Sequence, residues 1–304
     1  MSEESRAARL TTIAETYDRA RAERYWGEER LTLGEEFRIV LSAGEPHFVN
    51  RAYHVWETET LTRALPKSRG ARVLDLACGL GRVSRVLSAR GARVVGVDNA
   101  LAMLRRTRRA LGGSRRGAVA QAASHALPFA DGSFAAVVCF GLLEHLPRGL
   151  QEKTLAEAFR VLSPGGSLFL VLNNNHSLLL RAGEDNSFRR AEQLANGYFC
   201  GLVDRRRLTA ALGRRGARVR ALGSNAHYSL LRHGLRGRVR TRPEQAEAAR
   251  AFAEAARRDL EAPAQGWLGE ACADHFLYRI ERPRRAARAS SARSSGAKRK
   301  FRAR

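Results

Sequence analysis

Short apolar runs separated by segments of helical length occupy the chain from residue 72 onward. Runs such as Arg72–Ala77, Arg93–Val97 and Ala135–Phe140 are each followed by a loop and a helical pattern. Strands that alternate with helices of about 10–15 residues form a parallel sheet covered by helices. We therefore predict an α/β fold, a doubly wound, Rossmann-like sheet of seven mostly parallel strands.

Three regions differ in pattern, and they predict three parts of the chain. Residues 1–66 show helical spacing without strand-like alternation, so we expect a helical N-terminal cap. Residues 67–282 hold the strand–helix alternation, with an insertion at about 224–273 before the last strand. Residues 283–304 are basic and rich in Ala and Ser, which predicts a disordered tail.

The net charge is strongly positive. The 54 Lys and Arg residues outnumber the 30 Asp and Glu residues and give +24, and nearly all of the bases are arginine, a bias typical of a GC-rich genome. The tail concentrates these charges, so it is a candidate for weak binding to an anionic partner, either nucleic acid or a membrane surface. The alternative is a solvated tail that only aids solubility.

Several classes of protein are excluded by simple features. The apolar runs are too short for a transmembrane segment, and the polar N-terminus does not resemble a secretory signal. The four cysteines are far apart and form no CxxC pair, which argues against a zinc ribbon or a disulfide framework. We therefore expect a reduced, cytoplasmic protein, and we assign no metal ligands.

A glycine-rich loop follows the first predicted strand, in the segment Asp75 to Arg82 (DLACGLGR). Ligands of such sheets bind at the carboxyl ends of the strands, and glycines let the backbone approach a ligand closely. The spacing is neither the GxGxxG of a dinucleotide site nor a GK[ST] phosphate loop. A second acid, Asp98, ends the next strand, where a carboxylate can accept both hydroxyls of a ribose.

Five segments together resemble the class I S-adenosylmethionine-dependent methyltransferases, especially those acting on quinone precursors, sugars and other small molecules. The segments are VLDLACGLGRVS, VVGVDNALAML, LPFADGSFAAVVC, FGLLEHLPR and FRVLSPGGSLFLVL, in the family's order between Val73 and Leu172. The resemblance implies S-adenosyl-L-methionine as the cofactor.

Matched positions imply where this cofactor would bind. The loop around its methionine part would contain Asp75, Ala77, Cys78, Gly79 and Gly81. Asp98 would hold the ribose, with Asn99 and Met103 near the adenine, although Asp98 as a helix cap is the alternative. The family often has an acid at the position of Ala123, so Ser124 or His125 would contact the adenine instead. Ala77 departs from the usual glycine, and Ala135 from the usual aspartate.

A general base is needed only when the acceptor must lose a proton, as a hydroxyl does. Glu144 and His145 follow the fourth predicted strand and are the first candidates, the alternative being that they cap a helix and pack the loop. His176, next to the asparagines 173–175 that follow the fifth predicted strand, is a further candidate, and a hydrogen-bonding loop is its alternative. Tyr25 and Trp26 in the cap would either close over the site or pack in the core.

We therefore expect a methyltransferase that acts on a small-molecule or lipid-type acceptor, with oxygen as the expected acceptor atom. One alternative is a nucleic-acid methyltransferase that uses the basic surface, although no NPPY or DPPY segment follows the fourth strand. Another is a cofactor-binding protein without catalysis, motivated by Ala123 and Ala135. The identity of the acceptor and the oligomeric state do not follow from the sequence.

Overall fold

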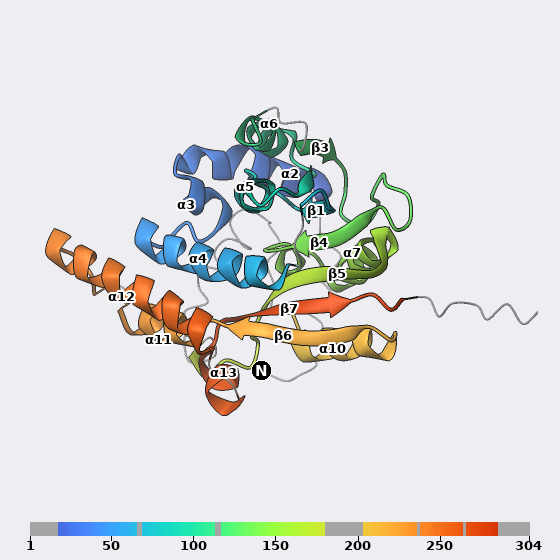
Figure 1. Cartoon of the computed structure of the whole chain (residues 1–304). Helices are drawn as coiled ribbons and strands as arrows, with labels where there is room; N and C mark the ends of the chain where they lie inside the picture. Colours follow the sequence, from blue (N-terminus) through green and yellow to red (C-terminus); the bar gives the residue numbers. More distant parts are fainter. Residues whose placement is uncertain are drawn as a thin grey trace, which may run out of the picture.

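A seven-stranded sheet forms the centre of the computed structural model, which describes residues 18–65, 69–112, 117–179, 203–235, 238–263 and 266–284 (Figure 1). The strand order is β3-β2-β1-β4-β5-β7-β6. The strands are β1 (Arg72–Leu76), β2 (Arg93–Asp98), β3 (Gly117–Gln121), β4 (Phe134–Cys139), β5 (Leu162–Asn173), β6 (Arg218–Ser224) and β7 (His275–Glu281). Only β7 runs antiparallel to its neighbours, β5 and β6, so the predicted doubly wound, mostly parallel sheet is confirmed.

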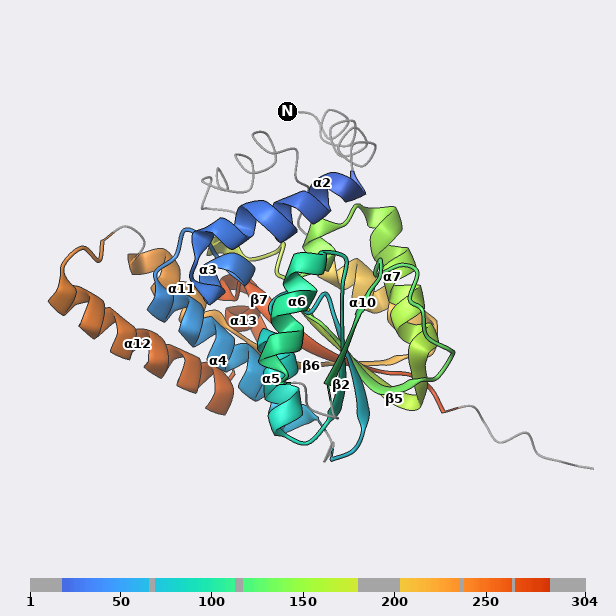
Figure 2. The same cartoon turned by 90° about the horizontal axis from the view of Figure 1, so that it is seen from above.

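Helices cover both faces of this sheet (Figure 2). One face carries α4 (His47–Ala64), α5 (Arg82–Ala89), α6 (Leu101–Ala110) and α12 (Arg242–Glu261). The opposite face carries α7 (Arg148–Val161) and α10 (Arg205–Arg214). The remaining helical elements are α2 (Arg19–Arg24), η1 (Tyr25–Glu29), η2 (Arg30–Leu33), α3 (Glu36–Val40), η3 (Leu143–His145), α11 (Ala226–Leu235) and α13 (Gly266–Cys272).

Side-chain alternation divides the core into two clusters, one on each face. Along β5, Leu168, Leu170 and Leu172 pack toward α7, whereas Phe169 and Val171 pack toward α4. Every residue of β5 from Ser167 to its end is buried, as expected for a central strand covered on both faces. This alternation also decides the face on which each polar side chain at the end of a strand lies.

Two regions contain more regular structure than their sequence indicates. Proline and glycine favour turns, yet the Ser-Pro-Gly-Gly segment at residues 163–166 is part of β5, which begins at Leu162. Gly165 adopts a φ of +79° there, and the segment is held by hydrogen bonds between its backbone and that of Arg282. The region predicted as an insertion, about 224–273, contains α11, α12 and α13.

Parts of two predicted regions lie outside the described residues: positions 1–17 of the cap and 285–304 of the tail. In the part of the chain that the structure describes, no helix combines the length and the apolar character needed to span a bilayer.

Candidate functional site

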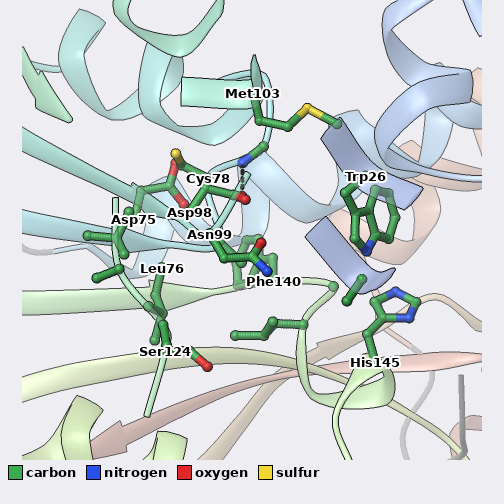
Figure 3. A pocket seen from close by; sticks show the side chains of 18 of the residues that line it. Trp26, Asp75, Leu76, Cys78, Asp98, Asn99, Met103, Ser124, Phe140 and His145 are labelled. Carbon is green, nitrogen blue, oxygen red and sulfur yellow. Dashed lines mark hydrogen bonds between the residues drawn. The ribbon is translucent and has the colours of Figure 1, made fainter. Parts of the chain in front are cut away.

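A cavity opens at the carboxyl ends of β1, β2 and β4 (Figure 3). Residues of the loops that follow these strands line it, together with residues 122–125 after β3 and Trp26 of η1. Because parallel strands all end at the same edge of the sheet, segments far apart in sequence meet there.

The loop after β1 has an unusual backbone conformation. Ala77, Gly79 and Gly81 all have positive φ angles, of 62°, 53° and 80°. A Cβ atom on Gly81 would lie 3.0 Å from the Cγ2 atom of Thr107, so this glycine lets the loop pack against α6. The Thr107 hydroxyl donates to the Gly79 carbonyl at 2.6 Å and fixes the turn.

Ala77 occupies a backbone conformation that favours glycine, and glycine is the usual residue at this position in the family that the motifs resemble. A side chain with a Cβ atom is strained at positive φ, whereas glycine is not. We expect Ala77→Gly to raise the free energy of unfolding by about 0.5–1 kcal/mol, as measured by urea denaturation. A loss of stability would show that the Ala77 methyl group has packing contacts that outweigh the strain.

Asp98 ends β2 and joins the loop to the start of α6. Its Oδ2 atom accepts a hydrogen bond from the Gly79 N–H at 2.9 Å (Figure 3). Its Oδ1 atom accepts one from the Ala100 N–H at 3.0 Å. Burial raises the pKa of this carboxyl group, while these N–H donors act in the opposite direction. Each carboxylate oxygen can accept a second hydrogen bond. Asp98 can therefore cap the start of α6 and bind a ligand at the same time.

Asp75 lies at the end of β1 and is 3% exposed. The Ser84 hydroxyl donates to its Oδ2 atom at 2.6 Å. Burial nevertheless raises the pKa of Asp75 to about 6, because the cost of burying the charge exceeds the gain from the hydrogen bond and from Arg82.

The raised pKa of Asp75 predicts how stability changes with pH. The folded protein holds this proton up to about pH 6, whereas the unfolded chain releases it near pH 3.8. The stabilisation from this group is therefore complete below the unfolded pKa and is lost as the pH rises through the folded pKa. Compared with that of Asp75→Asn, the free energy of unfolding of the unmodified protein should fall by about 1.4 kcal/mol per pH unit between about pH 4 and pH 6.

Urea denaturation of both proteins across this range measures the effect. Asp131→Asn, at a side chain that is 76% exposed, is the matched control for the loss of a carboxylate. If the unfolding free energies of Asp75→Asn and the unmodified protein differ by the same amount at every pH, Asp75 does not titrate in this range.

A buried ion pair lies beside the loop, and no sequence pattern had indicated it. Arg82 begins α5 and lines the cavity, and its Nη1 atom lies 2.5 Å from the Oε2 atom of Glu57 on α4. The two side chains are 8% and 2% exposed. Arg82 also lies 2.9 Å from the Nδ1 atom of His54. Burial, followed by the Arg82 charge, lowers the pKa of His54 to about 3, so His54 is neutral at pH 7.

Most of the residues predicted to contact a cofactor lie together around the cavity, as Figure 3 shows for six of them. Gly81 does not line it. The Ser124 hydroxyl lies 2.8 Å from that of Thr154, so this side chain turns toward α7. The predicted residues that line the cavity are Asp75, Ala77, Cys78, Gly79, Asp98, Asn99, Met103, Ser124 and His125.

The three candidate bases occupy different places. His145 lines the cavity, and its ring meets the ring of Trp26 edge to face, with 5.3 Å between the ring centres (Figure 3). Glu144 does not line this cavity, but its charge acts on Tyr53 of α4: burial raises the pKa of Tyr53, and Glu57 and Glu144 raise it further. Glu144 therefore lies close enough to α4 for its charge to act on Tyr53.

His176 does not line the cavity of the cofactor residues. Its backbone N–H donates to the Oδ1 atom of Asn174 at 3.2 Å, and burial lowers the pKa of its ring. Of the two aromatic residues of the cap, Tyr25 is 3% exposed and packs in the core, whereas Trp26 forms part of the cavity wall. Of the two alternatives, packing in the core applies to Tyr25, and a place at the site applies to Trp26.

Comparisons with known proteins agree with the motifs. Residues 73–166 match the family model described as a methyltransferase domain. A demethylmenaquinone methyltransferase of Clavibacter sepedonicus is 43% identical over 118 residues, which are 38% of this chain and 46% of that relative. A ubiquinone biosynthesis O-methyltransferase of Pseudomonas fluorescens is 30% identical over 169 residues, 54% of this chain and 64% of the relative. The chain therefore covers less than two thirds of the length of either relative.

Solved structures share the fold at low sequence identity. A possible histamine N-methyltransferase from Thermotoga maritima has a TM-score of 0.52 and 18% identity, covering 86% of this chain and 99% of that one. Phosphoethanolamine N-methyltransferase 2 of Haemonchus contortus, in complex with S-adenosyl-L-methionine, has a TM-score of 0.52 and 18% identity, covering 82% and 60%. The Rossmann-like fold predicted from the sequence is thereby confirmed.

Proposed function

We propose that this chain, a member of the class I S-adenosylmethionine-dependent methyltransferases, transfers a methyl group to an oxygen atom of a small-molecule or lipid-type acceptor. The observation that carries the proposal is the cavity at the ends of β1 and β2, where Asp98 fixes the glycine loop. The two relatives named for demethylmenaquinone and for ubiquinone biosynthesis support an acceptor of the quinone-precursor type.

The residues of the cavity fit this cofactor. We assign the ribose hydroxyls to the remaining acceptor positions of Asp98, and the methionine part to the loop between Asp75 and Gly79. Met103, which is 1% exposed, gives an apolar wall for the adenine. The cofactor, when bound, supplies a methyl group on a positively charged sulfur.

The charge of the cofactor gives Asp75 a role in binding. A positive ligand favours the ionised form of a nearby carboxyl group and therefore lowers its pKa. Because burial holds the pKa of Asp75 at about 6, binding would be coupled to release of this proton at lower pH. This placement explains why a charged group is retained at a position that is 3% exposed.

The chain itself must align the acceptor, exclude water and remove one proton. We assign the exclusion of water to Trp26, which lines the cavity. His145 is the proposed base on the cavity side, because its imidazole lines the cavity. Glu144 is the second candidate, because its charge acts on Tyr53.

Transfer of a radiolabelled methyl group from S-adenosylmethionine tests the proposal. The acceptors to compare are a panel of hydroxylated aromatic rings, isoprenoid quinols in detergent, and total RNA. Label incorporated into the ring or quinol hydroxyls would support the proposal. Incorporation only into RNA would favour the nucleic-acid alternative, and cofactor binding without transfer to any class would favour a non-catalytic binding protein.

A further inference from the structure

The three consecutive asparagines at the end of β5 have different surroundings. The Asn174 Nδ2 atom donates to the carbonyls of Glu270 and Ala273, at 2.7 and 2.9 Å, and its Oδ1 atom accepts from Arg205 at 3.0 Å. Asn174 therefore holds α13 and α10 against the sheet. Asn173 is 2% exposed, yet its Nδ2 atom has no hydrogen-bond partner among the described residues. A buried donor without a partner costs free energy, so it points to a ligand.

Asn173 faces the same side of the sheet as the ion pair near the cavity. Its side chain follows Val171 on one face of β5, because side chains two residues apart in a strand share a face. In the register of β5 and β7, Asn173 lies directly opposite His275, and such pairs project to the same face. Phe140 directly follows β4, the next strand toward the cofactor cavity; it packs on this face and also lines that cavity.

Aromatic side chains lie beside His275. The Tyr53 ring of α4 lies 5.1 Å from the His275 ring, in an edge-to-face arrangement, and 5.8 Å from the ring of Tyr228 on α11. Because Asn173 lies opposite His275, the buried amide and these rings lie on the face of the sheet that also carries Phe140 of the cofactor cavity.

Hydrogen bonds from Asn225 hold His275 in place. The Asn225 Oδ1 atom accepts from the His275 backbone N–H at 2.8 Å and from the Ser229 hydroxyl at 3.2 Å. The Asn225 Nδ2 atom lies 3.3 Å from His275 Nδ1. The start of β7, opposite Asn173, is thereby fixed against α11.

We infer that Asn173, with Tyr53, binds the oxygen substituents of an aromatic acceptor ring. The inference rests on the proposed function, and it assigns the acceptor class: a hydroxylated or quinone-like ring, not an amine. Donors on the wall suit oxygen atoms, and the rings of Tyr53 and Phe140 suit a flat aromatic body. Asn173 is the residue that determines this preference.

The experiment uses the full chain saturated with S-adenosylhomocysteine and two probes that differ only in hydroxyl groups, 4-nitrocatechol and nitrobenzene. Calorimetry gives both affinities for the unmodified protein, for Asn173→Leu, which keeps the size and removes the donor, and for Asn173→Ser, which keeps a shorter donor. We expect a preference of about tenfold or more for 4-nitrocatechol in the unmodified protein. Asn173→Leu should reduce it to about threefold or less, with Asn173→Ser between them.

Two further measurements distinguish a role of Asn173 in binding the acceptor from a structural role. The midpoint of thermal unfolding of Asn173→Leu without probe should be equal to or above that of the unmodified protein, because an unpaired buried amide has been removed. The affinity for S-adenosylhomocysteine should stay within about twofold. A lower midpoint, an unchanged preference in Asn173→Leu, or no preference in the unmodified protein would overturn the inference. Failure of the unmodified protein to bind S-adenosylhomocysteine would instead contradict the proposed function.

Discussion

Asp98→Ala should weaken the binding of S-adenosylhomocysteine by about 100-fold or more while the chain stays folded. In the proposed function the carboxylate binds the ribose, and in the structure it also holds the N–H groups of Gly79 and Ala100. Each hydrogen bond to a charged group contributes about 1.5–3 kcal/mol. Losing the two bonds from the ribose hydroxyls to the carboxylate would therefore account for the expected loss of affinity. Calorimetry measures the affinity, and circular dichroism checks the fold.

Two matched variants sharpen the Asp98 result. Asp98→Asn keeps the size and one acceptor oxygen, and its affinity should fall by only about tenfold. Asp131→Ala removes an exposed carboxylate that pairs with Arg160, and it should leave the affinity unchanged. Normal binding by Asp98→Ala would restrict Asp98 to the role of a helix cap and remove it from the cofactor site.

Glu57→Ala should lower the free energy of unfolding by about 3–5 kcal/mol, the largest stability effect we expect in this chain. The substitution leaves the Arg82 guanidinium buried without its carboxylate, and Arg82 is only 8% exposed. A buried charge that has lost its hydrogen-bonded partner is costly because water does not replace that partner. Urea denaturation at pH 7 measures the difference.

A control on the same helix is available. Glu59 pairs with Arg90 at 4.0 Å, and both side chains are about half exposed, so Glu59→Ala should change stability by less than about 0.5 kcal/mol. The double variant Glu57→Leu, Arg82→Met removes both charges and should recover more than half of the loss. Equal losses in Glu57→Ala and Glu59→Ala would show that the buried pair is not held in solution.

The sequence predicted the sheet well because its signals are local. Each strand of the parallel part is a short apolar run, and each is followed by a loop whose residues meet at one edge of the sheet. The positions of Asp75, Gly79 and Asp98 around the cavity follow from this rule. The start of β5 was missed because Gly165, at a φ of +79°, was expected to end the extended structure.

The acceptor side could not be predicted in the same way. Tyr53 and Glu57 belong to α4, outside the recognised motifs, and only the packing of this helix on the sheet brings them to the site. Asn173 and Asn174 are identical neighbours in the sequence, and they differ only because alternation sends them to opposite faces. His176 followed the same strand, but the structure places it with Asn174 and away from the cofactor residues.

The most direct test of the account is calorimetric titration of the full chain with S-adenosylmethionine and S-adenosylhomocysteine at low and at high salt. The account predicts one binding site for each ligand, with an affinity that barely changes with salt, because the contacts come from a part-buried carboxylate and an apolar wall. Absence of binding of both ligands, or binding that disappears at high salt, would contradict the cofactor site.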